Sequence, residues 1–187
     1  MEAFLVSSGI VALAEIGDKT QLLALLLAAR YRRPWPIIAA ILVATILNHL
    51  LAGVLGAWIA HQVGAHLMRW ILGISFIAMA IWILVPDKLD EDMPNLRKMG
   101  VFSTTLVLFF FAEMGDKTQI ATVALAAQYN SLFAVVAGTT FGMMLANVPV
   151  VLLGEKIRKL FPVMQVHALA ALLFVALGIA TLAGWGA

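Results

Sequence analysis

The sequence predicts an all-α membrane protein with six transmembrane helices, arranged as two inverted repeats of three helices each. Of its 187 residues, 63% are hydrophobic and only 12% are charged. Six apolar stretches are long enough to cross about 30 Å of hydrocarbon, which takes roughly 20 helical residues. A charged motif occurs twice, once in each half of the chain. A soluble core of this size could not bury so much apolar surface, so we expect a lipid bilayer around the protein and no nucleic-acid partner.

The six predicted helices are separated by short segments rich in proline or charge. We place them at residues 4–28, 36–60, 67–85, 101–127, 131–153 and 163–185. Proline and arginine residues follow the first helix, and the only sizeable polar loop, residues 86–100, follows the third. All five tryptophans fall near the ends of predicted helices, where the amphipathic ring suits the membrane interface: Trp35, Trp58, Trp70, Trp82 and Trp185. The chain has no cysteine, which excludes disulfides and thiolate chemistry.

The distribution of lysine and arginine predicts the orientation in the membrane. The loops after the first, third and fifth helices hold nine of these residues: Arg30, Arg32, Arg33, Lys88, Arg97, Lys98, Lys156, Arg158 and Lys159. The opposite side holds Arg69 alone. Because positively charged loops stay in the cytoplasm, we expect these three loops to face the cytoplasm and both termini to face outside.

The two halves of the chain repeat with a constant offset of 98 residues. This shift superposes residues 15–21 on residues 113–119, and it also pairs Tyr31 with Tyr129 and Phe76 with Phe174. Each unit has three predicted helices, so the second copy must enter the membrane from the opposite side. Inverted repeats are typical of secondary transporters, whose sites lie near the midplane. We therefore expect a single transmembrane domain, residues 1–187, with repeats at 1–85 and 101–187 and a cytoplasmic linker at 86–100.

Both copies of the motif Glu-x-Gly-Asp-Lys-Thr-Gln fall at the centre of a predicted helix. Glu15 lies about 11 residues into the first helix and Glu113 about 12 into the fourth, roughly 16–18 Å deep at 1.5 Å per residue. In a continuous helix, the Glu, Asp and Lys of each motif would share one face. Each charged group costs about 2.5–3.5 kcal/mol at the centre of a membrane helix. The six groups must therefore turn inward and meet one another or an ion.

The charges of the two motifs do not cancel, and this predicts a cation site. The four acids Glu15, Asp18, Glu113 and Asp116 outnumber the charge partners Lys19 and Lys117 by two. A divalent cation or two protons would neutralise the excess. The alternative, that Glu–Lys pairs only join the helices, leaves one carboxylate per repeat unexplained.

Neutral oxygens near the acids favour a hard cation such as Mg²⁺, Ca²⁺ or Mn²⁺. Further candidate ligands are Thr20, Thr118, Gln21, Gln119, Asn48, His49 and Asn147. His49 could be a ligand or proton carrier, or could simply hydrogen-bond between helices. Gly17 and Gly115 allow either close helix packing or a local break in the helix that offers backbone carbonyls. No Walker A loop, dinucleotide fingerprint or GxSxG motif is present, so nothing indicates an enzyme or a cofactor.

The twin motifs closely resemble those of the Gdt-type family, which comprises the Golgi calcium/manganese–proton antiporters of eukaryotes and the manganese exporters of bacteria. The resemblance extends over essentially the whole chain, and both motif copies match the family pattern. It implies that Glu15, Asp18, Glu113 and Asp116 bind the transported cation. The compact form resembles the bacterial branch, which implies a manganese exporter in the bacterial inner membrane.

We therefore expect proton-coupled export of Mn²⁺ by alternating access, in which protons and the cation compete for the same acids. Ca²⁺ is the rival substrate, or a broad range of divalent cations, because oxygen ligands serve several of them. A hydrolase with paired acids and a passive helical scaffold are the other hypotheses. The first lacks a recognisable catalytic motif, and the second does not explain the unbalanced central charge. The sequence indicates neither the oligomeric state nor the proton stoichiometry.

Overall fold

The computed structural model describes residues 1–85, 99–129, 131–154 and 162–184, and all of its regular structure in these residues is α-helical. The predicted linker therefore lies mostly outside the described residues. In chain order the helices are α1 (Glu2–Glu15), α2 (Lys19–Tyr31), α3 (Pro34–Gln62), α4 (Ala65–Trp82), α5 (Val101–Glu113), α6 (Lys117–Tyr129), α7 (Leu132–Leu153) and α9 (Val163–Leu182).

The structure corrects the prediction for the first and fourth helices, which are not continuous. The predicted helix at 4–28 is divided into α1 and α2, and the one at 101–127 into α5 and α6. Both breaks fall inside the charged motif, where a tight turn replaces helical backbone. The other four predicted helices correspond to α3, α4, α7 and α9, each long and apolar enough to cross a membrane. Pro149 lies within α7 without ending it.

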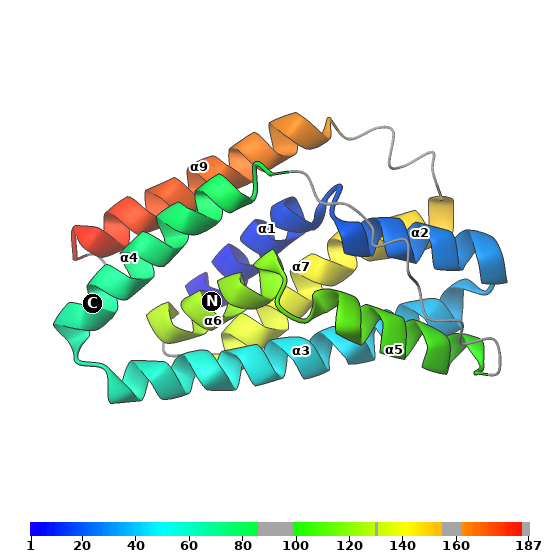
Figure 1. Ribbon diagram of the computed structural model, residues 1–187, viewed down its shortest axis with the longest axis horizontal. Coiled ribbons are helices and arrows are strands. Elements are labelled where there is room, and N and C mark those ends of the chain that lie inside the picture. The colour runs from blue at the N-terminus through cyan, green and yellow to red at the C-terminus, as the bar shows by residue number, and fades with distance from the viewer. Residues whose placement is uncertain (86–98, 130, 155–161, 185–187) are drawn as a thin grey trace.

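Each broken helix packs against the long helix of the other half of the chain. Here the first half means α1 to α4 and the second half means α5 to α9. Helix α1 lies along α7, whereas α3 lies along α5 and α6 (Figure 1). Helices α3 and α7 also contact each other. The two halves are therefore interleaved, and the segments that carry the two motifs meet in the middle of the bundle.

Glycines permit the closest approaches between these helices. A Cβ atom added to Gly138 or Gly142 of α7 would lie 2.6 Å from the Phe4 carbonyl oxygen or 2.5 Å from that of Ser8, both on α1. A Cβ atom on Gly56 of α3 would lie 2.2 Å from the carbonyl oxygen of Val123 on α6. Close backbone contact through small residues is how membrane helices associate when lipid removes the hydrophobic driving force.

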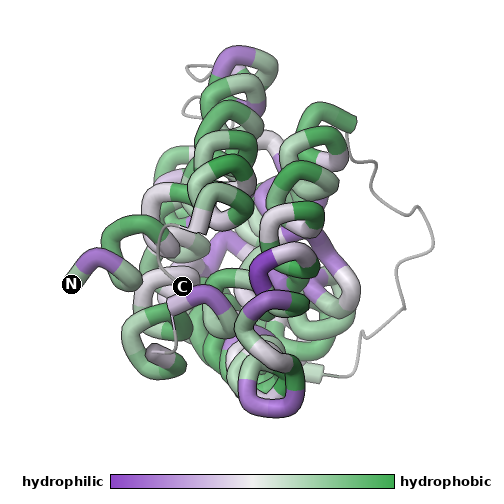
Figure 2. Tube along the Cα trace, turned by 90° about the vertical axis from the view of Figure 1, so that its left-hand side faces the viewer, coloured by the Kyte–Doolittle hydropathy of each residue, from purple (hydrophilic) through white to green (hydrophobic). Residues whose placement is uncertain are grey.

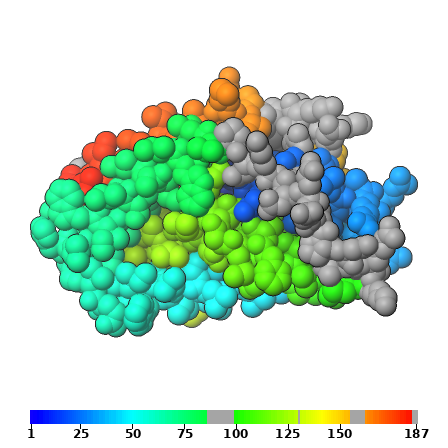
Figure 3. All heavy atoms as spheres, viewed as in Figure 1, coloured from blue at the N-terminus to red at the C-terminus, as the bar shows by residue number. Residues whose placement is uncertain are grey.

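Helices α4 and α9 form a separate pair, which we call the arm. The rings of Phe76 and Phe174, which are equivalent in the repeat, lie 6.3 Å apart at its centre. Gly73 and Gly178 bring the two backbones together. Figure 3 shows the arm along one side of the molecule and α3 along the other, with α6 visible between them. The arm thus joins the two halves a second time, because α4 belongs to the first half and α9 to the second.

Apolar side chains cover the outside of the bundle. Large exposed hydrophobic residues occur on all four long helices, for example Leu51, Ile81, Leu145 and Leu172. Figure 2 shows hydrophobic residues along most of each helix and hydrophilic segments at helix ends and within the bundle. This distribution suits a hydrocarbon solvent and is opposite to that of a soluble helical bundle.

We predict that Gly142→Ala destabilises the fold, because the new methyl group would overlap the Ser8 carbonyl oxygen of α1. Overpacking of this kind costs about 1–3 kcal/mol, which corresponds to a fall in melting temperature of about 2–12 °C for a chain of this length. The control is Gly9→Ala, since a Cβ atom at Gly9 of α1 would meet nothing within 4 Å. Thermal unfolding in detergent should show an unchanged or slightly higher melting temperature for the control. Equal melting temperatures for the two variants would contradict the packing described here.

Candidate functional site

Each motif folds into a type II β-turn between two half-helices. The backbone N–H of Asp18 donates to the carbonyl oxygen of Glu15 over 3.1 Å. Ile16 has φ −64° and ψ 115°, and Gly17 has φ +87°, which match the second and third residues of a type II turn. A positive φ at the third position favours glycine, because it has no Cβ atom to clash. This turn is the physical reason that the predicted continuous helix is broken.

The second motif repeats the same geometry. Met114 has φ −63° and ψ 121°, Gly115 has φ +75°, and the Asp116 N–H donates to the Glu113 carbonyl oxygen over 3.1 Å. The x-Gly pair thus forms the corner of the turn in both halves. Glu15 and Glu113 are the last residues of α1 and α5, and each aspartate immediately precedes the next half-helix.

The glutamine at the end of each motif stabilises the turn. The side-chain oxygen of Gln21 accepts the N–H of Gly17 over 2.9 Å, and Gln119 does the same for Gly115 over 2.6 Å. This resembles a capping box, in which a Glu or Gln on the first helical turn reaches back to a free backbone N–H. The pattern Gly-Asp-x-x-Gln is therefore a helix-start signal inside an apolar stretch, and it could have identified the break from the sequence.

The lysines of the two motifs form crossed ion pairs between the halves. Lys19 Nζ lies 3.4 Å from Asp116 Oδ2, and Lys117 Nζ lies 3.9 Å from Asp18 Oδ1. Asp18, Asp116 and Lys117 are buried, whereas the Lys19 side chain is 28% exposed. Each lysine thus pairs with the aspartate of the other motif.

The two glutamates lie fully buried at the centre of this arrangement. Thr20 donates a hydrogen bond to Glu15 Oε1, and Thr118 donates one to Glu113 Oε2 over 3.0 Å. Each glutamate thus accepts a hydrogen bond from the threonine of its own motif. Glu15 interacts electrostatically with Glu113, Asp18 and Asp116. The remaining oxygens, Glu15 Oε2 and Glu113 Oε1, are buried and have no hydrogen-bond partner among the described residues.

The other predicted polar residues surround this centre at different distances. Asn147 of α7 donates to Glu15 Oε1 over 3.3 Å, so it is in direct contact with the acids. Gln21 and Gln119 donate instead to the Ala146 carbonyl oxygen and to Asn48 Oδ1. Asn48 donates to the Phe110 carbonyl oxygen over 3.0 Å. These amides therefore connect the turns to α3, α5 and α7.

His49 of α3 is fully buried, and neither ring nitrogen has a hydrogen-bond partner within the described part of the chain. It is the repeat equivalent of Asn147, which contacts Glu15. One expected role of His49 was a hydrogen bond between helices. The His49 ring makes no such bond with the described residues. Its role as a ligand stays a prediction.

One polar contact at the site was not anticipated. The buried His167, on α9, places Nε2 2.7 Å from the carbonyl oxygen of Ile16, so the ring N–H donates to the corner of the first turn. The break in the helix frees this carbonyl from helical hydrogen bonding. The 98-residue offset pairs His167 with Arg69. The sequence signal for this contact is that both repeats carry a basic residue, Arg69 or His167, at the same position.

The described residues contain no group of three or more His, Cys, Asp or Glu side chains arranged to hold a metal ion. What the structure does bring together is two glutamates and the two threonine hydroxyls bonded to them, with Asn147 beside Glu15. The helices α1 and α5 both end at this point, and the C-terminal end of a helix carries a partial negative charge. The N-terminal ends of α2 and α6 lie a few residues later and carry the opposite partial charge, so the negative excess of the centre comes from its four acids, which outnumber the two lysines by two.

Comparisons with known proteins agree with this chemistry. The model of the family described as "Divalent cation/proton antiporter GDT1" matches residues 3–91 and 101–186. The chain is 50% identical over 182 residues to a Vibrio cholerae protein named "Putative manganese exporter", covering 97% of this chain and 90% of that protein. It is 28% identical to a GDT1-like protein of Synechocystis over 93% of both chains. It is 26% identical to GDT1-like protein 5 of Arabidopsis thaliana, over 97% and 96% of the respective chains. No solved structure matches significantly.

We predict that Gly17→Ala destabilises the protein more than Gly115→Ala does. Both substitutions place a methyl group on left-handed backbone, which costs about 1–2 kcal/mol. At Gly17 the Cβ atom would also lie 2.4 Å from Val163 Cγ1 of α9, whereas at Gly115 it would meet nothing within 4 Å. The melting temperature should therefore fall in both variants and fall further for Gly17→Ala. A larger fall for Gly115→Ala would be inconsistent with these turns.

Proposed function

Because the chain belongs to the GDT1 family of divalent cation/proton antiporters, we propose that it exports a divalent cation, Mn²⁺ in the first place, in exchange for protons. The exchange site consists of Glu15 and Glu113 at the meeting point of the two motifs. The observation that carries this proposal is that both carboxylates are fully buried and each accepts a hydrogen bond from the threonine of its own motif, while one oxygen of each has no hydrogen-bond partner among the described residues.

The crossed ion pairs divide the four acids into two roles. Asp116 is paired with Lys19, and Asp18 with Lys117, so the aspartates and lysines largely balance one another. The two glutamates then carry the excess of two negative charges. Burying an unneutralised carboxylate costs several kcal/mol even after relaxation. One divalent cation or two protons would remove that cost, because each adds two positive charges to the centre.

This equivalence supplies the coupling. The centre is neutral when it holds a dication and also when it holds two protons, so both loaded forms can rearrange within the membrane. The empty, ionised centre keeps two uncompensated charges at membrane depth, which is strongly disfavoured. The transporter therefore changes its orientation only when it is loaded, and the cation moves outward as protons move inward. The proposed stoichiometry is two protons for each cation.

The ligand set suits a hard cation. The oxygen ligands are the two carboxylates, the hydroxyls of Thr20 and Thr118, water, and Asn147 Oδ1, which is buried and has no hydrogen-bond partner among the described residues. Mn²⁺ and Ca²⁺ both accept such ligands, and the unpartnered nitrogens of His49 would favour Mn²⁺. The name of the Vibrio relative supports the same choice. Exchange of Ca²⁺, or of a broad range of divalent cations, is the alternative.

We further propose that the chain crosses the bilayer six times as one domain of two inverted repeats. The order of two half-helices, a long helix and one more helix occurs in both halves, which supports this architecture. Each half-helix has 13 or 14 residues, about 20 Å, so α1 with α2, and α5 with α6, would each cross the membrane together. The protein would reside in a bacterial inner membrane, with its termini outside and its basic loops in the cytoplasm.

Glu15→Gln and Glu113→Gln should each abolish Mn²⁺ export, with a loss of at least tenfold. Each variant removes an anionic ligand and a proton-binding group at once. Neither should lower the melting temperature, because each removes one of several mutually repelling carboxylates. The measurement is Mn²⁺ flux in proteoliposomes driven by a proton gradient, together with proton release from detergent-solubilised protein when Mn²⁺ is added. The control is Glu2→Gln, at an exposed acid at the start of α1.

Wild-type Mn²⁺ flux and proton release in both glutamine variants would overturn the proposed site. Faster Ca²⁺ than Mn²⁺ exchange in the wild-type protein, with the same sensitivity to the two variants, would keep the site and change the substrate. Flux that responds to an imposed membrane potential would contradict the two-to-one stoichiometry but not the site.

The proposed orientation predicts opposite labelling at two positions. A cysteine at Gly64, between α3 and α4, should react with an impermeant thiol reagent in intact cells, since a side chain there has open space. A cysteine at the exposed Arg33, before α3, should react only after the membrane is permeabilised. The chain has no natural cysteine, so the background is clean. The reverse labelling pattern would refute the orientation.

A further inference from the structure

We propose that the arm, α4 with α9, is held in one of two positions by a latch that alternates between His167 and Arg69. The inference rests on the inverted-repeat antiporter proposed above. It adds two positioning residues, neither of which is part of the cation site. In the position seen here, His167 holds the arm against the first turn. In the other position, Arg69 would hold it against the second turn.

The latch present in this structure joins α9 to the corner of the first motif. His167 Nε2 donates to the Ile16 carbonyl oxygen over 2.7 Å. Val163, one turn earlier on α9, packs so closely against Gly17 that no Cβ atom would fit there. Ile16 and Gly17 lie between Glu15 and Asp18, so this contact acts directly on the turn that carries both acids.

Among the described residues, the equivalent contact in the second half is not formed. The 98-residue offset pairs Ile16 with Met114 and His167 with Arg69. Met114 is 53% exposed, and a Cβ atom at Gly115 would meet nothing within 4 Å. Arg69 Nε is buried without a hydrogen-bond partner among the described residues. Arg69 and the second turn thus occupy the places that correspond to His167 and the first turn, and among the described residues they are not joined.

A second contact of the arm shows the opposite asymmetry. At the end of α4, the Val85 carbonyl oxygen accepts a hydrogen bond from Lys117 Nζ over 3.0 Å. The repeat equivalents are Ala183, just after α9, and Lys19. Lys117 is 2% exposed and Lys19 is 28% exposed. The arm therefore covers the lysine of the second motif and leaves that of the first more accessible.

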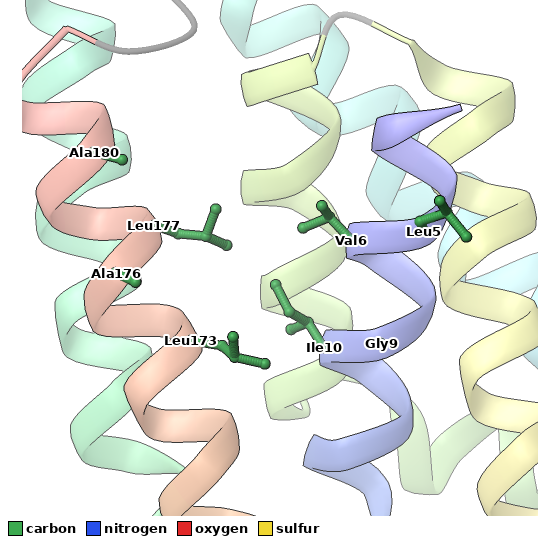
Figure 4. A pocket seen from close by; sticks show the side chains of 8 residues that line it. All are labelled: Leu5, Val6, Gly9, Ile10, Leu173, Ala176, Leu177 and Ala180. Atoms are coloured by element: carbon green, nitrogen blue, oxygen red, sulfur yellow. The ribbon is translucent and has the colours of Figure 1, made fainter.

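The packing of the helices is asymmetric in the same way, since among the described residues the arm packs more extensively on one half-helix of each repeat than on its repeat equivalent. The arm contacts α1 through α9 and α6 through α4. The repeat equivalents of these contacts would be α5 with α4 and α2 with α9. Along α1 the contact is loose, because an apolar cavity of about 390 Å³ separates Val6 and Ile10 from Leu173 and Leu177 (Figure 4). A cavity of this size provides few contacts that a movement of the arm would break.

Exchanging the conformations of the two repeats gives the opposite state. In it, Arg69 would donate to the Met114 carbonyl oxygen, Lys19 would contact the Ala183 carbonyl oxygen, and the arm would pack on α2 and α5. With the proposed orientation, α1 and α6 lie in the outer half of the membrane. The structure described here would then be closed outside, and the exchanged state would be closed towards the cytoplasm. The two turns remain in the middle of the membrane throughout.

The test measures the position of the arm by spin labels on cysteines introduced at exposed sites. Ala183, after α9, and Leu26, on α2, are both exposed. The C-terminal end of α9 and helix α2 lie at opposite ends of the molecule (Figure 1). The exchanged state should bring them much closer, because Ala183 would then lie beside Lys19. Labels at Ile74 and Leu172, both within the arm, should keep one distance and serve as the control.

Two repeat-equivalent substitutions should shift the two distance populations in opposite directions. His167→Ala removes the latch seen here and should raise the ratio of short to long Ala183–Leu26 distances about fivefold, as for one lost hydrogen bond. Arg69→Ala should lower that ratio by a similar factor. His167→Gln keeps a side-chain hydrogen-bond donor, so its ratio of short to long distances should lie closer to that of the parent. The comparison is made at a pH at which the parent shows both distances.

Shifts in the same direction in His167→Ala and Arg69→Ala, or no shift in either variant, would overturn the latch. A parent protein that shows only the long distance at every pH and Mn²⁺ concentration would also overturn it. General damage to the fold does not produce opposite shifts. The distances do not depend on turnover, so the two proposals fail separately. Opposite shifts in a protein that does not exchange Mn²⁺ for protons would keep the latch and refute the function. Exchange of Mn²⁺ for protons without these shifts would keep the function and refute the latch.

Discussion

Charged side chains buried among apolar helices have to be neutralised by one another, and here each lysine finds its aspartate on the other half of the chain. The pairs Lys19–Asp116 and Lys117–Asp18 bring the two turns together at the centre of the bundle. Removing one member of a buried pair would leave the other uncompensated, at a cost of about 3–5 kcal/mol. The interleaved packing of α1 with α7, and of α3 with α5 and α6, places both turns where these pairs can form. The glutamates are then left with each other and with whatever cation or proton enters.

The type II turn gives each residue of the motif a separate task. Glycine allows the corner, glutamine caps it, and aspartate and lysine begin the next half-helix. The glutamate ends the preceding half-helix, and its carboxylate accepts a hydrogen bond from the threonine of the same motif. A continuous helix would offer only side chains at this depth, since its carbonyls are bonded within the helix. The break exposes backbone groups as well, and the Ile16 carbonyl oxygen is already in use by His167.

Much of the fold and the membership of the family could be predicted from the sequence, because apolar length and a repeated motif are local signals. The long helices α3, α4, α7 and α9 follow directly from apolar stretches of sufficient length. A local break was one of the two roles expected of Gly17 and Gly115, and the structure shows it. The apolar residues on either side nevertheless favoured one continuous predicted helix, although the capping pattern indicates a helix start. The crossed pairing was not predictable, because Lys19 has an equally suitable acid in its own motif and only the tertiary packing decides between them. The contact of His167 depends on where the arm lies, which no local pattern specifies.

The crossed pairing also has a consequence for how the protein is made. Translation delivers the first motif to the membrane before the second motif exists, so Asp18 and Lys19 enter without the partners they have in the finished structure. Until α5 and α6 arrive, these charges and Glu15 have only one another, water or the insertion machinery to shelter them from hydrocarbon. Stable insertion of α1 and α2 is therefore completed by residues synthesised about a hundred positions later. We therefore expect membrane insertion of the two halves to be coupled, and a fragment that ends before α5 to insert poorly.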